Sequence, residues 1–351
     1  MIKLPGFLKW RYELYVSEYV DLYGSLGFFI RAIFNNLRYG YNPKIAYIYA
    51  NKGNVGDYIS HCGIRDSFNK PGLWLFCSPV WSRYLVRNLA RLKKRNPNCI
   101  LIIGGGGLLQ PVFENFWSLV IDSGLTFVMV GIGINELEGR GTFDQKLLKN
   151  IVSKSSYLTV RDSYTQKRIL DISGALVPVT VCPSVRFLQQ YREKNRRGEK
   201  KKLLHVLHPA DLRMAGIDIE LLRNSVREAA VCLNLDYQES TNMSSNHITA
   251  ITGILDSAIV VSSRLHGCIM SYALDIPFVA LECDRKIKYF IETHTGNAVL
   301  DPRTIGHNTQ LIQILEKTMN SQRGISQLDR QLDEYDRSIE HALDFVPRIR
   351  R

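Results

Sequence analysis

Short apolar runs rich in β-branched residues recur along the sequence, and each is followed by a polar turn and then by an apolar pattern of helical period. Such runs are typical of buried parallel strands. The clearest are Lys44–Ala50, Cys99–Ile103, Thr126–Val130, Tyr157–Val160, Leu203–Leu207, Ala258–Val261 and Pro277–Cys283. Strands that alternate with helices in this way predict an α/β fold built on parallel sheets.

The alternation is interrupted by a polar, strongly charged stretch, residues 192–202, which has no apolar periodicity and is typical of an exposed linker. We therefore predict an N-terminal extension (1–43), a Rossmann-like domain (44–191), the basic linker, and a second Rossmann-like domain with a helical tail (203–351). Two doubly wound domains of this kind would face each other across a cleft. The last helix, over Gln327–Phe345, could pack back across the domain junction.

The formal net charge of +12 favours an anionic partner, such as a phosphorylated substrate or an acidic membrane surface. Nucleic acid is disfavoured, because the basic linker lacks interleaved aromatic residues. The extension 1–43 mixes aromatic and basic residues. It could be a helix that lies on anionic lipid, or its aromatic residues could simply pack on the first domain.

The seven cysteines are scattered, and none forms a Cys-x-x-Cys pair or a zinc-ligand spacing. We expect no metal site and a reducing compartment. No signal peptide pattern is present, and the longest apolar run, Ser118–Ile134, is interrupted by Asp122. We therefore expect a cytoplasmic protein, peripheral at the inner face of the membrane if the extension binds lipid.

Most of the chemistry is concentrated in the stretch Ile259–Ile269. A buried strand ends there, and Ser262 and Ser263 could cap the helix that follows. Arg264 and His266 would then lie at the carboxyl end of a strand, where open α/β sheets bind ligands. A helix N-terminus, a guanidinium and an imidazole together suit a small dianion that is protonated or attacked. The alternative is a structural turn, with Arg264 paired to a local carboxylate.

Two further strands end in cations. Arg161 follows the strand Tyr157–Val160 and precedes a helix, which repeats the geometry of Arg264. The alternative for Arg161 is an ion pair with Asp162. Several cations, Lys288 among them, follow Pro277–Cys283 and would come to the same edge of the second sheet.

Two turns of the first domain also follow strands. In the first, Asp57 is a natural N-cap for a helix over Tyr58–Phe68, and Asn54 permits left-handed backbone angles. In the second, Gly104–Gly107 would let a phosphate, a sugar ring or another backbone come close. The glycines form neither a G-x-G-x-x-G nor a P-loop pattern, so neither a dinucleotide nor ATP is predicted. Capping alone and a tight turn alone are the structural alternatives.

These motifs, in this order, resemble those of the polysaccharide pyruvyl transferase family. Residues 54–57 (N-V-G-D) are similar to its N-x-G-D motif, residues 104–107 to its glycine-rich turn, residues 160–163 (V-R-D-S) to its R-D element, and residues 263–267 (S-R-L-H-G) to its S-R-L-H-A/G signature. The resemblance covers roughly residues 44–295. One departure is Cys182, which stands where the family usually has the aspartate of an Asp-Pro pair.

The resemblance implies a GT-B-like fold and the transfer of pyruvate from phosphoenolpyruvate to a sugar, as a ketal that bridges two hydroxyls. The sugar would belong to a cell-surface or exported polysaccharide, such as a capsule, or to its lipid-linked precursor. Phosphate would be released, and no cofactor would be consumed. The implied roles are donor binding for Arg161, Arg264, Leu265 and His266, general acid for His266, base for Asp57, and acceptor or cleft contacts for Asn54, Gly104, Gly105, Gly106 and Lys288.

Two other functions are compatible with the sequence. A GT-B-type nucleotide-sugar glycosyltransferase would share the two domains and the glycine-rich turns, and would bind a nucleotide sugar instead of phosphoenolpyruvate. A non-catalytic glycan-binding homologue is suggested by the net charge, the aromatic extension and Cys182. It would bind glycan without releasing phosphate.

Overall fold

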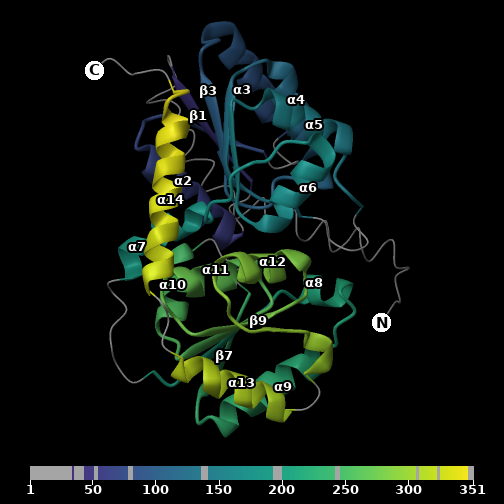
Figure 1. The fold of residues 1–351 in the computed structure, drawn as a ribbon, viewed down its shortest axis with the longest axis vertical. Coiled ribbons are helices and arrows are strands. Elements are labelled where there is room, and N and C mark those ends of the chain that lie inside the picture. The colour runs from purple at the N-terminus through teal and green to yellow at the C-terminus, as the bar shows by residue number, and fades with distance from the viewer. Residues whose placement is uncertain are drawn as a thin grey trace.

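The computed structural model describes two parallel sheets, each surrounded by helices (Figure 1). The described residues are 34, 43–50, 54–77, 82–135, 141–192, 200–241, 246–305, 308–321 and 325–346. The predicted extension 1–43, except Phe34 and Pro43, and residues 193–199 of the predicted linker lie outside them. No helix in the described ranges is long and apolar enough to cross a membrane.

The first sheet has five parallel strands in the order β2-β1-β3-β4-β5. Their bounds are β1 Ile45–Tyr49, β2 Leu73–Phe76, β3 Ile100–Gly104, β4 Phe127–Ile132 and β5 Tyr157–Val160. Alternate strand residues face two different cores, because successive side chains of a strand point to opposite faces. One face is covered by α3 Ser82–Arg95, α4 Glu114–Ser123, α5 Gln145–Lys154 and α6 Ser163–Ser173, and the other by α2 Val55–Phe68 and α7 Pro183–Arg192.

The second sheet has the order β10-β9-β8-β6-β7, again with parallel neighbours. Its strands are β6 Lys202–Val206, β7 Asp236–Ser240, β8 Ile259–Ser262, β9 Phe278–Leu281 and β10 Val299–Leu300. Helices α10 His247–Leu255, α11 Leu265–Ala273 and α12 Arg285–His294 pack on the face toward the first domain, while α9 Ile219–Cys232 and α13 Asn308–Asn320 pack on the other. The short α8 spans Pro209–Met214.

The two domains share one apolar core. It extends from β1 through α2, α7 and α11 to β8, and it includes the last helix, α14 (Ile325–Leu343). Helix α14 contacts both domains: Ser338 accepts a hydrogen bond from Tyr157 at 3.1 Å, and Gln331 accepts one from Tyr272 at 2.8 Å. Figure 1 shows α14 running alongside both domains. The predicted fold of two Rossmann-like domains is confirmed, and the last helix does pack across the junction.

Three strands were not predicted: β2, β7 and β10. All three lie at sheet edges. An edge strand needs less apolar surface than a central one, and β7 has no fully buried residue. The apolar pattern of β7 is therefore weak, and β10 has only two residues, whereas β2 (Leu-Trp-Leu-Phe) is apolar throughout and was missed despite its pattern.

Candidate active site

Several predicted site residues of the two domains lie together at the domain junction. The imidazole ring of His266, at the start of α11, lies directly against Gly56, at the start of α2, so that a side chain on Gly56 would overlap the ring. The positive charges of Arg161, Arg264 and Lys286 all act on this ring. We call Asp57, Arg161, Arg264, His266 and Lys286 the interdomain cluster.

On the first domain, Asp57 lies in the first turn of α2 but does not cap it. The N-cap is Asn54, whose side chain accepts a hydrogen bond from the N–H of Gly56 at 3.1 Å, so α2 begins at Val55 rather than at the predicted Tyr58. Capping by Asn54 leaves the Asp57 carboxylate beside the glycine turn: a Cβ on Gly106 would lie 2.7 Å from Oδ1 of Asp57.

The glycine turn brings α2 close to the end of β3. Gly105 and Gly106 have φ angles of +70° and +79°, which L side chains rarely adopt. Gly105 packs against the side chain of Ser60, and Gly106 against that of Asp57. The space beside both glycines is thus filled by protein atoms. The turn therefore positions Asp57, while the interpretation of Gly104–Gly106 as a phosphate cradle receives no support from the geometry.

Arg161 follows β5 and is fully buried, with 1% of its surface exposed. Its guanidinium lies against Gly133, and Nε is 3.2 Å from Oδ2 of Asp162. The other carboxylate oxygen of Asp162 caps α6 by accepting from the N–H of Thr165 at 2.8 Å. The ion pair with Asp162, which was the structural alternative for Arg161, is therefore present. Nη2 of Arg161 is buried and has no hydrogen-bond partner among the described residues.

Helix α11 begins differently from the prediction. Its N-cap is Arg264, which makes no side-chain capping bond, whereas Ser262 accepts from the N–H of Arg264 at 3.1 Å. The predicted capping by Ser262 or Ser263 is therefore wrong. The guanidinium of Arg264 donates to the carbonyl oxygen of Thr241 at 2.8 Å. The side chain of Leu265 is buried in the shared core, so only its backbone N–H, in the first turn, could face a ligand.

His266 is electrostatically unusual. It is 8% exposed, and its Nε2 has no hydrogen-bond partner in the described part of the chain. Burial, and then the positive charges of Arg161, Arg264 and Lys286, hold the pKa of His266 well below its usual range. The imidazole of the ligand-free protein is therefore neutral at neutral pH. A negatively charged ligand placed among these cations would raise its pKa.

The lysine of the cluster is Lys286, not the predicted Lys288. Lys286 lies in the first turn of α12, where its ammonium group is 2.7 Å from Asp284 and donates across the junction to Asn135 at 3.0 Å. Lys288 is exposed. The N-cap Asp284 was a usable signal, because it marks the helix start and so places Lys286 in the turn nearest the junction.

Cys182, which stands where the resemblance implies an aspartate, is a buried thiol. Its sulfur lies 3.4 Å from the hydroxyl of Ser60 and accepts a hydrogen bond from Ser184 at 3.1 Å. It belongs to the shared core between α2 and α7. Its contacts are thus with the inner side of α2, beneath the turn that carries Asp57.

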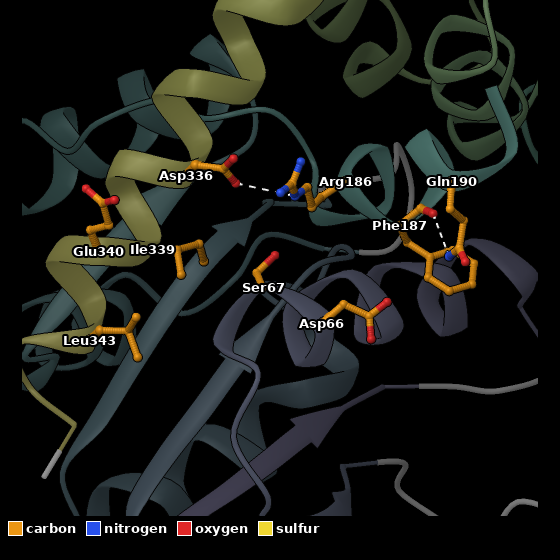
Figure 2. Close-up of a pocket in the computed structure, with 9 residues that line it drawn as sticks. All are labelled: Asp66, Ser67, Arg186, Phe187, Gln190, Asp336, Ile339, Glu340 and Leu343. Atoms are coloured by element: carbon orange, nitrogen blue, oxygen red, sulfur yellow. Dashed lines mark hydrogen bonds and ion pairs between the residues drawn. The ribbon is translucent and has the colours of Figure 1, made fainter. Parts of the chain in front are cut away.

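A separate pocket of about 510 Å³ lies between α2, α7 and α14 (Figure 2). Its lining residues are Asp66, Ser67, Arg186, Phe187, Gln190, Asp336, Ile339, Glu340 and Leu343. Asp66 and Ser67 belong to the last turn of α2, at the opposite end of the helix from Asp57. The pocket contains no residue of the interdomain cluster, so we do not assign the chemistry to it.

The fold and the site define a class, the two-domain α/β proteins of GT-B type with functional groups at the domain junction. The UDP-GlcNAc 2-epimerase of Methanocaldococcus jannaschii matches with a TM-score of 0.56 at 8% identity, over 86% of this chain and 99% of that one. The Neisseria meningitidis UDP-GlcNAc 2-epimerase bound to UDP-GlcNAc matches with 0.55 at 11% identity, over 83% and 98%. At such identities the likeness shows the fold alone.

The sequence comparison identifies the family more specifically than the structural likeness does. The family described as polysaccharide pyruvyl transferase matches residues 33–285, which is more than half of the chain. This chain belongs to the polysaccharide pyruvyl transferase family. A search of curated proteins found no match.

Proposed function

We propose that this protein transfers pyruvate from phosphoenolpyruvate to two hydroxyls of one sugar in a cell-surface or exported polysaccharide, or in its lipid-linked precursor. One observation carries the proposal. Nη2 of Arg161 and Nε2 of His266 are buried, belong to the interdomain cluster and have no partner among the described residues. Buried polar atoms are rarely left unpaired, because desolvation without a hydrogen bond is unfavourable. A ligand that accepts from both would satisfy them.

Phosphoenolpyruvate has suitable chemistry, since it carries a carboxylate and a phosphate. Arg161 would bind one of these groups through Nη2, with Arg264 and Lys286 contributing positive charge. The N-terminus of α11 adds backbone N–H groups that no N-cap side chain occupies, including that of Leu265. By contrast, side chains of Asp162 and Asp284 cap α6 and α12.

In the reaction, His266 would donate a proton to the methylene carbon, which makes the neighbouring carbon electrophilic. A sugar hydroxyl attacks that carbon while Asp57 accepts its proton. The carbon–oxygen bond to phosphate then breaks, and a second hydroxyl closes the ketal. Over the whole reaction one hydroxyl proton replaces the proton given to the new methyl group, and the other leaves with phosphate. No nucleotide, redox cofactor or metal takes part in this scheme.

The lowered pKa of His266 fits an acid that is charged only when the donor is bound. In the free protein, burial and then the neighbouring cations disfavour the imidazolium. The anionic donor would offset these charges and so favour protonation of the ring. Donor binding and activation of the acid would then be coupled.

We further propose that the protein works in the cytoplasm and touches anionic lipid at the inner face of the membrane, where a lipid-linked acceptor is presented. The support comes from α3, which has no acidic residue. Arg87, Arg91 and Lys94 share one exposed face of this helix and form no ion pair within the described ranges. Such a face suits a negatively charged membrane surface.

Thermal shift and turnover assays would test the proposed function. We expect phosphoenolpyruvate, but not UDP-sugars, to raise the melting temperature. With a panel of lipid-linked or nitrophenyl glycosides, phosphate should be released and the product should gain the mass of a pyruvyl ketal. Stabilisation by a UDP-sugar alone would favour the glycosyltransferase, and glycan binding without phosphate release would favour the non-catalytic homologue.

A further inference from the structure

His294, the last residue of α12, links the two domains at the main chain of Arg161. It is 4% exposed, and its Nε2 lies 2.7 Å from the carbonyl oxygen of Arg161. A carbonyl oxygen can only accept, so the hydrogen must be on Nε2 and His294 is the donor. The residue thus binds, across the junction, the backbone of the arginine that carries the unpartnered Nη2.

This hydrogen bond is one of several contacts that hold the main chain and the side chain of Arg161 in place. The N–H of Arg161 donates to the carbonyl oxygen of Ile132 at 3.0 Å, its carbonyl oxygen accepts from His294, and its Nε pairs with Asp162. The guanidinium lies against Gly133, where no side chain displaces it. With these groups held, the buried Nη2, which has no partner among the described residues, remains available to a ligand.

His294 is itself held by the C-terminal helix. Nε2 of Gln327 and Nε2 of Gln331, both on α14, donate to its carbonyl oxygen at 3.0 and 3.3 Å. Tyr272 of α11 donates in turn to Gln331 at 2.8 Å. Helix α11, which carries His266, is therefore connected through α14 and α12 to the main-chain carbonyl oxygen of Arg161.

We propose that His294 is a positioning residue for the donor, which acts through Arg161 and does not touch the ligand. Its bond joins one domain to the other, so it exists only while the domains are arranged as they are in this structure. In that arrangement it holds the Arg161 peptide, and with it the free end of the guanidinium, in place for an anion. This inference rests on the proposed function, because phosphoenolpyruvate is the anion.

Variants of His294 that separate hydrogen bonding from packing test the inference. His294→Leu removes the hydrogen-bonding group. In His294→Asn the side-chain amide is too short to reach the position of Nε2, whereas in His294→Gln the amide reaches it. We expect the Leu and Asn variants to weaken phosphoenolpyruvate binding about five- to tenfold, as loss of one hydrogen bond predicts. Their KM for phosphoenolpyruvate should rise more than their kcat falls. His294→Gln should stay within about twofold of wild type.

Thr293→Val is the matched control. The Thr293 hydroxyl lies 2.9 Å from that of Ser163 across the same junction, and its hydrogen bonds are to Ser163 and to the carbonyl oxygen of Tyr289. We expect wild-type donor affinity in this variant. Folded Leu and Asn variants with wild-type affinity would overturn the inference, as would an equal loss in Thr293→Val. If wild-type protein does not bind phosphoenolpyruvate, the proposed function itself is wrong and the inference fails with it.

Discussion

At the scale of single residues, the site depends on which atoms are left without partners and on which charges surround them. Gly56 matters because it has no side chain, which lets the His266 ring of one domain lie against the first turn of α2 of the other. Burial, and then three neighbouring cations, lower the pKa of that ring. Close packing between domains thus creates both the shape and the electrostatics of the site.

The His266→Gln variant tests the general acid. A positioned acid contributes about 10²–10⁴ in rate, so we expect kcat to fall by roughly that factor while phosphoenolpyruvate still binds. Turnover requires the protonated ring and should fall as the pH rises through its pKa. Because the free protein holds this pKa low, the fall in kcat/KM should occur at lower pH than the fall in kcat, which reports the donor-bound state.

The control for this prediction is His341→Gln, which changes an exposed histidine on α14 and should leave both pH profiles unaltered. The fold of both variants is checked by their melting temperatures. Wild-type kcat in folded His266→Gln protein would show that another group supplies the proton.

At the scale of elements, each domain contributes strand ends and helix starts to one junction. Helix α2 brings Asp57 and the turn between β5 and α6 brings Arg161 from the first domain, and α11 and α12 bring His266 and Lys286 from the second. Helix α3 has another character, since its sequence contains several cations and no acidic residue. The chemistry and the proposed membrane contact are therefore carried by different helices.

The proposed lipid contact is tested by reversing charges on α3. Each basic side chain near an anionic surface contributes about 1 kcal/mol, so the triple variant Arg87→Glu, Arg91→Glu, Lys94→Glu should bind phosphatidylglycerol vesicles at least about a hundredfold more weakly. Cosedimentation measures this binding, and vesicles of phosphatidylcholine alone should bind neither protein.

A matched control changes the net charge equally on α13 and α14, through Lys317→Glu, Arg330→Glu and Arg337→Glu, all at exposed positions. Its vesicle binding should remain close to that of wild type. An equal loss in both triple variants would mean that only the overall charge matters and that α3 is not the contact face.

At the scale of the whole molecule, buried neutral histidines make stability depend on pH. Burial is the first cause that lowers the pKa of four histidines, in one case (His205) to about 4; the four are His61, His205, His266 and His294. In the unfolded chain their pKa values return to about 6.5. Below that pH the unfolded state binds more protons than the folded state, so stability must fall as the pH falls.

We therefore expect the melting temperature to drop between pH 7 and pH 5, as measured by differential scanning calorimetry. The raised pKa values of Asp66 and Asp336, which are caused by partial burial, act in the opposite direction and reduce the drop. His205→Gln removes one deeply buried titrating group and should show a smaller drop than wild type. Equal melting temperatures at the two pH values would contradict the burial of these histidines.

The sequence by itself determined the fold class and placed the main candidate site residues at the ends of strands. Apolar runs of strand length followed by turns predicted seven of the strands, and these turns placed Arg161, Arg264 and His266 at strand ends. Such signals are local, because strand and helix periodicity is expressed within a few residues. The edge strand β7 was missed for the same reason, since partial burial leaves a weak apolar pattern.

Only the tertiary structure decided which side chains meet. Lys286 rather than Lys288 faces the junction because of the way α12 packs. Asn54 rather than Asp57 caps α2 because of the geometry of the turn before that helix. The bond from His294 joins residues 133 positions apart, beyond the reach of any periodic pattern. Contacts between domains depend on the shapes of both packed surfaces, and no local stretch of sequence encodes these.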